Sequence, residues 1–238
     1  MAIHPIGNID LTRITRHMDD AKQTEVLQEL LNRVSANKSR YDLFSLYQCE
    51  LGEMRILHPL IREICTNLLM ENYYAAVALT NMLFEATMKF GLIYLKADGR
   101  TLDDVESFED IHKEEVSNYD DQDLEQNINA CKRAGFITKD ESKTLKDLSK
   151  LFRNNLSHAS FSKMASGVKG KFYLGRLSDL SHMEEQDMEI SNIPIFYMQY
   201  LNQFVQHESK WYFYTIMHFV EKFDKMITDT FRNRKVGT

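Results

Sequence analysis

The sequence predicts an all-α fold, and three of its features indicate that class. Apolar residues recur every three or four positions over long segments, which places them along one face of a helix. The 238 residues include only nine glycines and three prolines. Helix-start signals also precede two of the periodic segments. Few turn-forming residues and long unbroken segments favour helices over the many short strands of a β-sandwich or barrel.

The N-terminal part of the chain is expected to be helical after a short arm. Residues 1–20 predict a loosely held arm or a short helix, and helices are expected at about 20–36 and 41–57. Pro59 marks either a break or the first turn of the next helix, because proline is tolerated there. That next helix carries a clean apolar stripe up to Met70.

Residues 72–95 form the most apolar segment of the protein. Its length and near-continuous hydrophobicity predict a central bundle helix that touches neighbours on several sides. Glu85 is the one carboxylate within this segment. A carboxylate in such a helix has to be paired, hydrogen-bonded or exposed to a cleft.

The chain then becomes acidic over residues 103–125, which predicts a solvated loop with a short helix. A second short helix is expected at about 121–134, with Gly135 well placed to end it. Thr138 and Glu141 have the spacing of a capping box, so another helix is expected to begin there. Its apolar stripe should continue through Leu145, Leu148, Leu151, Phe152, Leu156 and Ala159.

The last part of the chain is expected to be less regular and then helical again. Gly167 and Gly170 break the helical pattern, and residues 171–177 predict a short strand or an extended loop. Residues 195–231 are rich in aromatic side chains and predict two helices that pack on the bundle or on a second copy. The chain is therefore divided into an N-terminal arm with helices, a bundle core and an aromatic-rich extension, at residues 1–58, 59–165 and 166–238.

Composition limits the class of protein. The net charge of −6 argues against indiscriminate binding of nucleic acid through bulk charge. Cys49, Cys65 and Cys131 are odd in number and form no CxxC pair, which favours a reducing compartment over a disulfide framework or a zinc site. No signal-peptide core is evident, and no stretch approaches the roughly 20 apolar residues that span a bilayer. We therefore expect a cytoplasmic protein with no membrane partner.

The helix that begins at Thr138 carries the residues with the clearest chemical potential. Lys143, Lys146, Lys150 and Arg153 are spaced three, four and three residues apart, which places four cations along one side of a helix. Asn154 and His158, four residues apart, lie together beside that strip. In an ideal helix Arg153 and His158 are about 140° apart. They would converge through the reach of arginine, a local distortion or a second subunit.

Residues 153–158 read RNNLSH, an R-x4-H pattern, and the surrounding segment AGFITKDESKTLKDLSKLFRNNLSHA resembles the HEPN superfamily. The apolar segment 72–95 also resembles the long helix that precedes the motif helix in that family. The resemblance covers residues 59–161 and implies an antiparallel helical bundle with additional N- and C-terminal helices. It further implies a metal-independent endoribonuclease, without a cofactor, that acts on RNA as a homodimer.

In that family the motifs of both copies face each other in one cleft, and the resemblance assigns roles to the residues here. His158 would be the general acid/base, because the ordinary pKa of a histidine side chain, about 6.5, lies near working pH. Arg153 would grip the scissile phosphate, and Asn154 would orient the imidazole or bind the phosphate. The three lysines would guide the RNA backbone electrostatically. Glu85 would support the motif from the neighbouring helix, although an ion pair with Lys89 fits its position equally well.

The resemblance also implies a biological setting and leaves alternatives open. HEPN nucleases act in prokaryotic defence, toxin–antitoxin systems and stress responses, so an antitoxin or another defence protein is a possible partner. One branch carries a modified tyrosine two residues after the histidine, and Ser160 stands there in this chain. The alternative functions are a non-catalytic helical module that binds RNA or a protein, and an interaction domain that uses the aromatic C-terminal segment.

Overall fold

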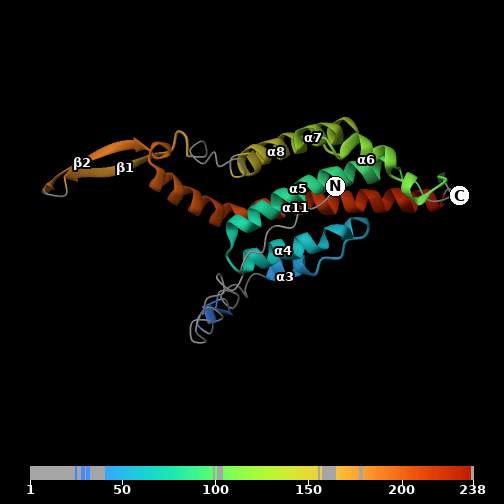
Figure 1. The fold of residues 1–238 in the computed structure, drawn as a ribbon, viewed down its shortest axis with the longest axis horizontal. Helices are drawn as coiled ribbons and strands as arrows, with labels where there is room; N and C mark the ends of the chain where they lie inside the picture. Colours follow the sequence, from blue (N-terminus) through green and yellow to red (C-terminus); the bar gives the residue numbers. More distant parts are fainter. Residues whose placement is uncertain are drawn as a thin grey trace, which may run out of the picture. The chain divides into compact units, whose positions relative to one another are not determined.

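The computed structural model describes residues 25, 28–29, 31–32, 41–98, 100, 104–154, 156, 165–176 and 179–236. The chain divides into two compact units, residues 1–41 and 42–238, and the second holds almost all of the described residues. This second unit is mostly helical and contains one two-stranded hairpin (Figure 1). The helical character of the predicted all-α fold is confirmed, but the hairpin is a β element that an all-α fold does not include. The arm expected at 1–20 and most of the helix expected at 20–36 lie outside the described residues.

The single helix predicted over residues 41–57 is wrong. The chain forms α3 (Tyr41–Tyr47), leaves the helix, and resumes as the short 3-10 helix η1 (Glu53–Leu57). Asp224, about 170 residues later, accepts hydrogen bonds from the backbone N–H groups of Gly52 and Met54 at 3.0 and 2.8 Å. A carboxylate from a distant helix therefore caps η1, and such a contact leaves no local signal in the sequence.

The next two helices agree with the sequence prediction. Helix α4 (His58–Leu69) has Pro59 in its first turn, as expected, and buries Ile61, Ile64, Cys65, Leu68 and Leu69. A short turn, in which Glu71 adopts the left-handed conformation with φ +61°, leads into α5 (Tyr73–Lys96). The expectation that no stretch is long and apolar enough to cross a membrane does not hold for α5, which meets both conditions. The most apolar part of α5 is nevertheless 56% buried inside the protein. Helix α5 is the central helix of the bundle, as predicted.

The acidic region contains short helical elements, in agreement with the sequence: η3 (Phe108–Asp110) and α6 (Lys113–Tyr119). Helix α7 (Leu124–Arg133) follows and ends before Gly135, which has φ +78°. Helix α8 (Lys139–Leu148) begins with the predicted capping box, in which the Glu141 N–H donates to Thr138 Oγ1 and the Thr138 N–H donates to the Glu141 carboxylate.

The prediction that the motif helix is α-helical throughout is wrong for residues 149–154, and most of residues 155–159 lie outside the described residues. After Leu148 the backbone changes to a π-helix, η4 (Ser149–Asn154). Strand β1 (Lys169–Arg176) follows and confirms the extended segment expected at 171–177. It pairs antiparallel with β2 (Asp179–Glu189), from Lys169 opposite Glu189 onward. The sequence of β2, DLSHMEEQDME, is acidic and poor in β-branched residues, which explains why no strand was expected there.

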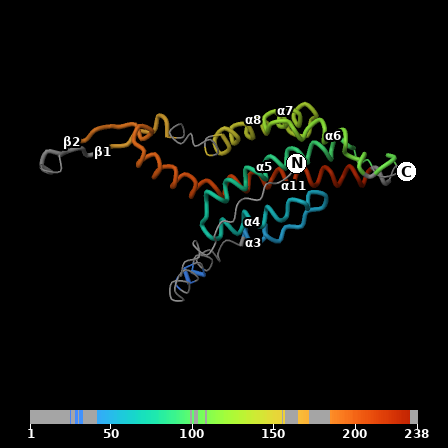
Figure 2. Tube along the Cα trace, viewed as in Figure 1, coloured from blue at the N-terminus to red at the C-terminus, as the bar shows by residue number. Residues whose placement is uncertain are grey.

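The aromatic C-terminal segment forms one helix rather than the predicted two. After η5 (Ile190–Asn192), helix α11 (Pro194–Val236) continues for 43 residues, because no glycine or proline interrupts it after Pro194. Three contacts join the two helices: Tyr74 with Asn202, Asn81 with Tyr212, and Gly91 with Phe223. The residue numbers increase along both helices from one contact to the next. Helices α5 and α11 therefore lie side by side and run in the same direction (Figure 2).

Candidate functional site

Arg153 and Glu85 form an ion pair between η4 and α5. Arg153 Nη2 donates to Glu85 Oε2 at 3.4 Å, and both side chains are about one-third exposed, at 32% and 34%. On its other side, Glu85 Oε1 lies 3.7 Å from Lys89 Nζ. Glu85 therefore contacts the motif residue Arg153 as well as Lys89, the ion-pair partner expected from the sequence. The pairing engages one edge of the Arg153 guanidinium, and among the described residues no hydrogen bond uses its other N–H groups.

The π-helical turn sets the direction of Arg153. A π-helix is rare and replaces the i→i+4 pattern of the α-helix by a wider turn, often at functional positions. Phe152 is fully buried and anchors the turn, since its ring stacks on Tyr212 at 4.0 Å with an interplanar angle of 1°. It also contacts Phe204 at 5.4 Å. The ideal α-helical projection therefore does not hold over residues 149–154, and His158 lies outside the described residues.

A buried polar pair supports this turn from α5 and α11. Tyr212 is fully buried, and its hydroxyl donates to Asn81 Oδ1 at 2.7 Å. Burial raises the pKa of Tyr212, and the nearby Arg153 cation only partly opposes that rise. The phenol therefore remains a protonated donor. Asn81 precedes Glu85 by one helical turn of α5. Asn81 binds Tyr212, which stacks on Phe152, and Glu85 pairs directly with Arg153.

Sequence reasoning missed Asn81 and Tyr212. The available signal was an amide in the middle of the most apolar segment, one turn before Glu85, since a buried amide needs a partner. That partner is 131 residues away in sequence, and nothing local points to it. Asn154, by contrast, is exposed at the end of η4, beside Arg153. His158 lies outside the described residues.

The predicted strip of four cations is divided by ion pairs. Lys146 Nζ lies 3.3 Å from Glu125 Oε1 on α7, and Arg153 is paired with Glu85. Lys143 and Lys150 are exposed, and within the described part of the chain neither forms an ion pair. As far as the described residues show, Lys143 and Lys150 can therefore meet an anionic ligand without breaking an ion pair.

The other reactive side chains described by the structure show little sign of activation. Burial raises the pKa of Cys65 and of Cys131 to about 12, so both thiols are protonated. His112 packs edge-on against Tyr94, and burial lowers its pKa. Over the described residues, no three His, Cys, Asp or Glu side chains are grouped closely enough to hold a metal ion.

Comparison of the chain with protein-family models, with curated proteins and with solved structures gave no match. The described geometry defines a mostly helical protein with an arginine held at the surface by a carboxylate and a π-helical turn.

Proposed function

We propose that this chain is a HEPN-type, metal-independent endoribonuclease that cleaves RNA at a site shared by two copies. The observation that carries the proposal is the placement of Arg153. A π-helical turn, anchored by the stack of Phe152 on Tyr212, presents the guanidinium beside Glu85 at the start of the R-x4-H segment. Asn154 follows it and is exposed.

The proposed reaction uses the 2′-hydroxyl of the RNA as its nucleophile. A neutral His158 imidazole removes the 2′-hydroxyl proton, and the oxygen attacks the adjacent phosphorus. A protonated imidazole, supplied by the second copy, gives a proton to the leaving 5′-oxygen. The products are a 2′,3′-cyclic phosphate and a 5′-hydroxyl. Arg153 binds the phosphate oxygens as negative charge builds up on them, and it remains charged at any working pH.

The surroundings of Arg153 fit this role. Because Glu85 occupies one edge of the guanidinium, the remaining N–H donors can face a phosphate. Lys143 and Lys150 are exposed and can attract the backbone on either side of the cleaved bond. Asn154 is placed to bind a phosphate oxygen or to orient the imidazole. In this proposal Glu85 positions Arg153 and does not touch the RNA.

Metal-free RNA cleavage by the purified chain tests the proposal. Wild-type protein, His158→Ala and Arg153→Ala are incubated with mixed RNA in EDTA, and the new ends are analysed chemically. We expect 2′,3′-cyclic phosphate ends with the wild type and none with either variant. His207→Ala is the matched control, because His207 is an exposed histidine on α11 outside the R-x4-H segment. Undiminished cleavage by His158→Ala would assign the activity to a contaminant or to another site.

The proposed setting is a prokaryotic cell under phage attack or stress, with the protein in the cytoplasm. An antitoxin or another defence protein would restrain or trigger the nuclease. A homodimer is required, because acid and base come from different copies. Light scattering that gives only a monomer across the concentrations at which RNA is cut would contradict the shared site.

A protein-interaction role is the second candidate, and exposed apolar side chains on α11 favour it. Ile195 is 72% exposed and Trp211 is 50% exposed. If this role holds without catalysis, metal-free cleavage will be absent from wild-type protein and Trp211→Ala will weaken self-association or partner binding.

A further inference from the structure

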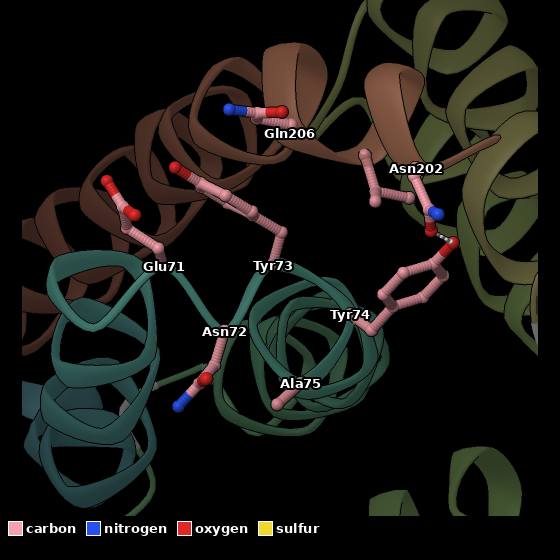
Figure 3. A pocket seen from close by; sticks show the side chains of 8 residues that line it. Glu71, Asn72, Tyr73, Tyr74, Ala75, Asn202 and Gln206 are labelled. Atoms are coloured by element: carbon pink, nitrogen blue, oxygen red, sulfur yellow. Dashed lines mark hydrogen bonds between the residues drawn. The ribbon is translucent and has the colours of Figure 1, made fainter. Parts of the chain in front are cut away.

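A surface pocket of about 510 Å³ lies where the start of α5 faces the first half of α11 (Figure 3). It does not include Arg153. Its lining residues come from the α4–α5 turn, the first turn of α5 and one face of α11, namely Glu71, Asn72, Tyr73, Tyr74, Ala75, Asn202, Val205 and Gln206.

Aromatic rings and carboxamides dominate this lining. Tyr73 and Tyr74 extend from α5, and Tyr74 is 44% exposed (Figure 3). The Tyr74 hydroxyl donates to Asn202 Oδ1 at 2.6 Å, and among the described residues the Asn202 side-chain nitrogen has no acceptor. Among the described residues, no hydrogen bond uses the side-chain amide of Asn72 or Gln206.

The charge of the lining restricts the class of ligand. Glu71 is the one charged residue among those that line the pocket, and no lysine or arginine lies among them. A phosphate or another anion would therefore find no cation here. A flat, uncharged ring with donors and acceptors on its edge fits better, because phenol faces stack on such rings and carboxamides bind their edges.

We propose that this pocket binds one unpaired nucleobase of a single-stranded RNA. Tyr74 supplies the stacking face, and the carboxamides of Gln206 and Asn202 read the edge of the base. The identification of the ligand as RNA rests on the proposed function. The pocket would then give the nuclease a base preference at a nucleotide away from the cleaved bond.

The position of the pocket relative to Arg153 supports this arrangement. Tyr74 and Glu85 both lie on α5, eleven residues and therefore about 16 Å apart along the helix. On α11, Val205 in the pocket follows Phe204, whose ring contacts Phe152, the residue before Arg153. One RNA strand that passes Arg153 could therefore place a nearby base in the pocket along the same two helices.

Binding of RNA that cannot be cleaved tests the pocket separately from catalysis. Fluorescein-labelled 2′-O-methyl hexamers of A, C, G and U lack the nucleophile, and their binding to the full chain is followed by anisotropy. We expect the wild type to prefer one base. Tyr74→Ala should weaken binding of that hexamer by about fivefold or more, since a stacked base contributes on the order of 1–3 kcal/mol.

Two further variants and one control sharpen the test. Tyr74→Phe should retain most of the binding because the ring remains, and Gln206→Ala should reduce the preference among the four hexamers. Met82→Ala is the control, because Met82 is 59% exposed on α5 and does not line the pocket. Circular dichroism checks that each variant is folded.

The outcomes separate this inference from the proposed nuclease. If the wild type binds no hexamer, or if Tyr74→Ala and Gln206→Ala bind all four as the wild type does, the nucleobase pocket is wrong even where His158→Ala abolishes cleavage. If hexamer binding depends on Tyr74 while His158→Ala still cleaves RNA, the pocket stands and the proposed catalytic site fails.

Discussion

The buried hydroxyl of Tyr212 donates a 2.7 Å hydrogen bond to Asn81 Oδ1, and the same ring stacks on Phe152 in the π-helical turn. Asn81 lies one helical turn from Glu85, the carboxylate that pairs with Arg153. The contacts of Tyr212 and the Glu85–Arg153 ion pair therefore join α5, α11 and η4. Local backbone geometry and the direction of Arg153 therefore depend on contacts between residues far apart in the sequence.

Replacement of Tyr212 by Phe should destabilise the protein by about 1–3 kcal/mol. The change keeps the stack on Phe152 but leaves Asn81 Oδ1 buried without its donor, and an unsatisfied buried acceptor has a cost of that size. Urea unfolding measures the loss. Tyr197→Phe on α11, which breaks no hydrogen bond in the described structure, is the control and should stay within about 0.5 kcal/mol of the wild type. Equal stability of the two variants would show that the Tyr212–Asn81 contact is of no consequence.

Replacement of Glu85 by Gln should separate activity from stability. The ion pair is about one-third exposed, so solvent screening limits its contribution to under about 1 kcal/mol. If Glu85 positions Arg153, kcat/KM for RNA should fall by roughly tenfold, which corresponds to about 1.4 kcal/mol. The control is Lys89→Met, which leaves the Arg153–Glu85 contact in place and should retain activity. A Glu85→Gln enzyme with normal kcat/KM would remove Glu85 from the proposed site.

Gly91 should not tolerate alanine. A Cβ atom at this position would lie 3.0–3.1 Å from the ring of Phe223, which is fully buried and has little room to move. The overpacking cost of about 1–3 kcal/mol should exceed the gain in helix propensity of up to about 1 kcal/mol. We expect a net loss of stability, measured by thermal unfolding, with Ala75→Gly as a control for propensity on the same helix. A higher melting temperature for Gly91→Ala would mean that Phe223 moves aside.

Acid should weaken the contact between α8 and α11. Burial by itself raises the pKa of Glu141, but hydrogen bonds from Lys222 and from the Thr138 backbone outweigh it and lower the pKa overall. A carboxylate with a depressed pKa in the folded state stabilises the fold above its unfolded value, and that stabilisation is lost as pH falls through the folded value. Stability should therefore decline below about pH 4.5. Glu141→Gln should show a smaller decline than the wild type, whereas exposed Glu63→Gln should follow the wild type.

The elements that sequence analysis predicted correctly are those with local causes. The capping box of Thr138 and Glu141, the end of α7 before Gly135 and the proline at the start of α4 all depend on neighbouring residues. The apolar segment 72–95 forms α5, and its hydrophobic composition favours burial of that helix in the core. The ion pair of Glu85 could also be anticipated, since a carboxylate in such a helix needs a partner.

The features that sequence analysis missed depend on distant contacts. The break within residues 41–57 is capped by Asp224, and the π-helical turn is held by Tyr212 on α11. The residue types from Thr138 onward fit an ordinary α-helix, and nothing local in residues 149–154 indicates a π-helical turn. Helix α11 is one helix of 43 residues, where two were predicted. Helices in globular proteins average about 10–14 residues, so a single helix of this length is unusual.

The central claim is that His158 performs acid–base catalysis on RNA, and one measurement tests it most directly. The first-order rate of cleavage of one defined RNA in EDTA is compared for wild type and His158→Ala. We predict a fall of at least about a hundredfold, the size expected when a general acid–base group is lost, and cyclic phosphate ends in the wild-type products. Equal rates for the two proteins, or no cleavage by a folded dimeric wild type over a broad set of RNAs, would contradict the account.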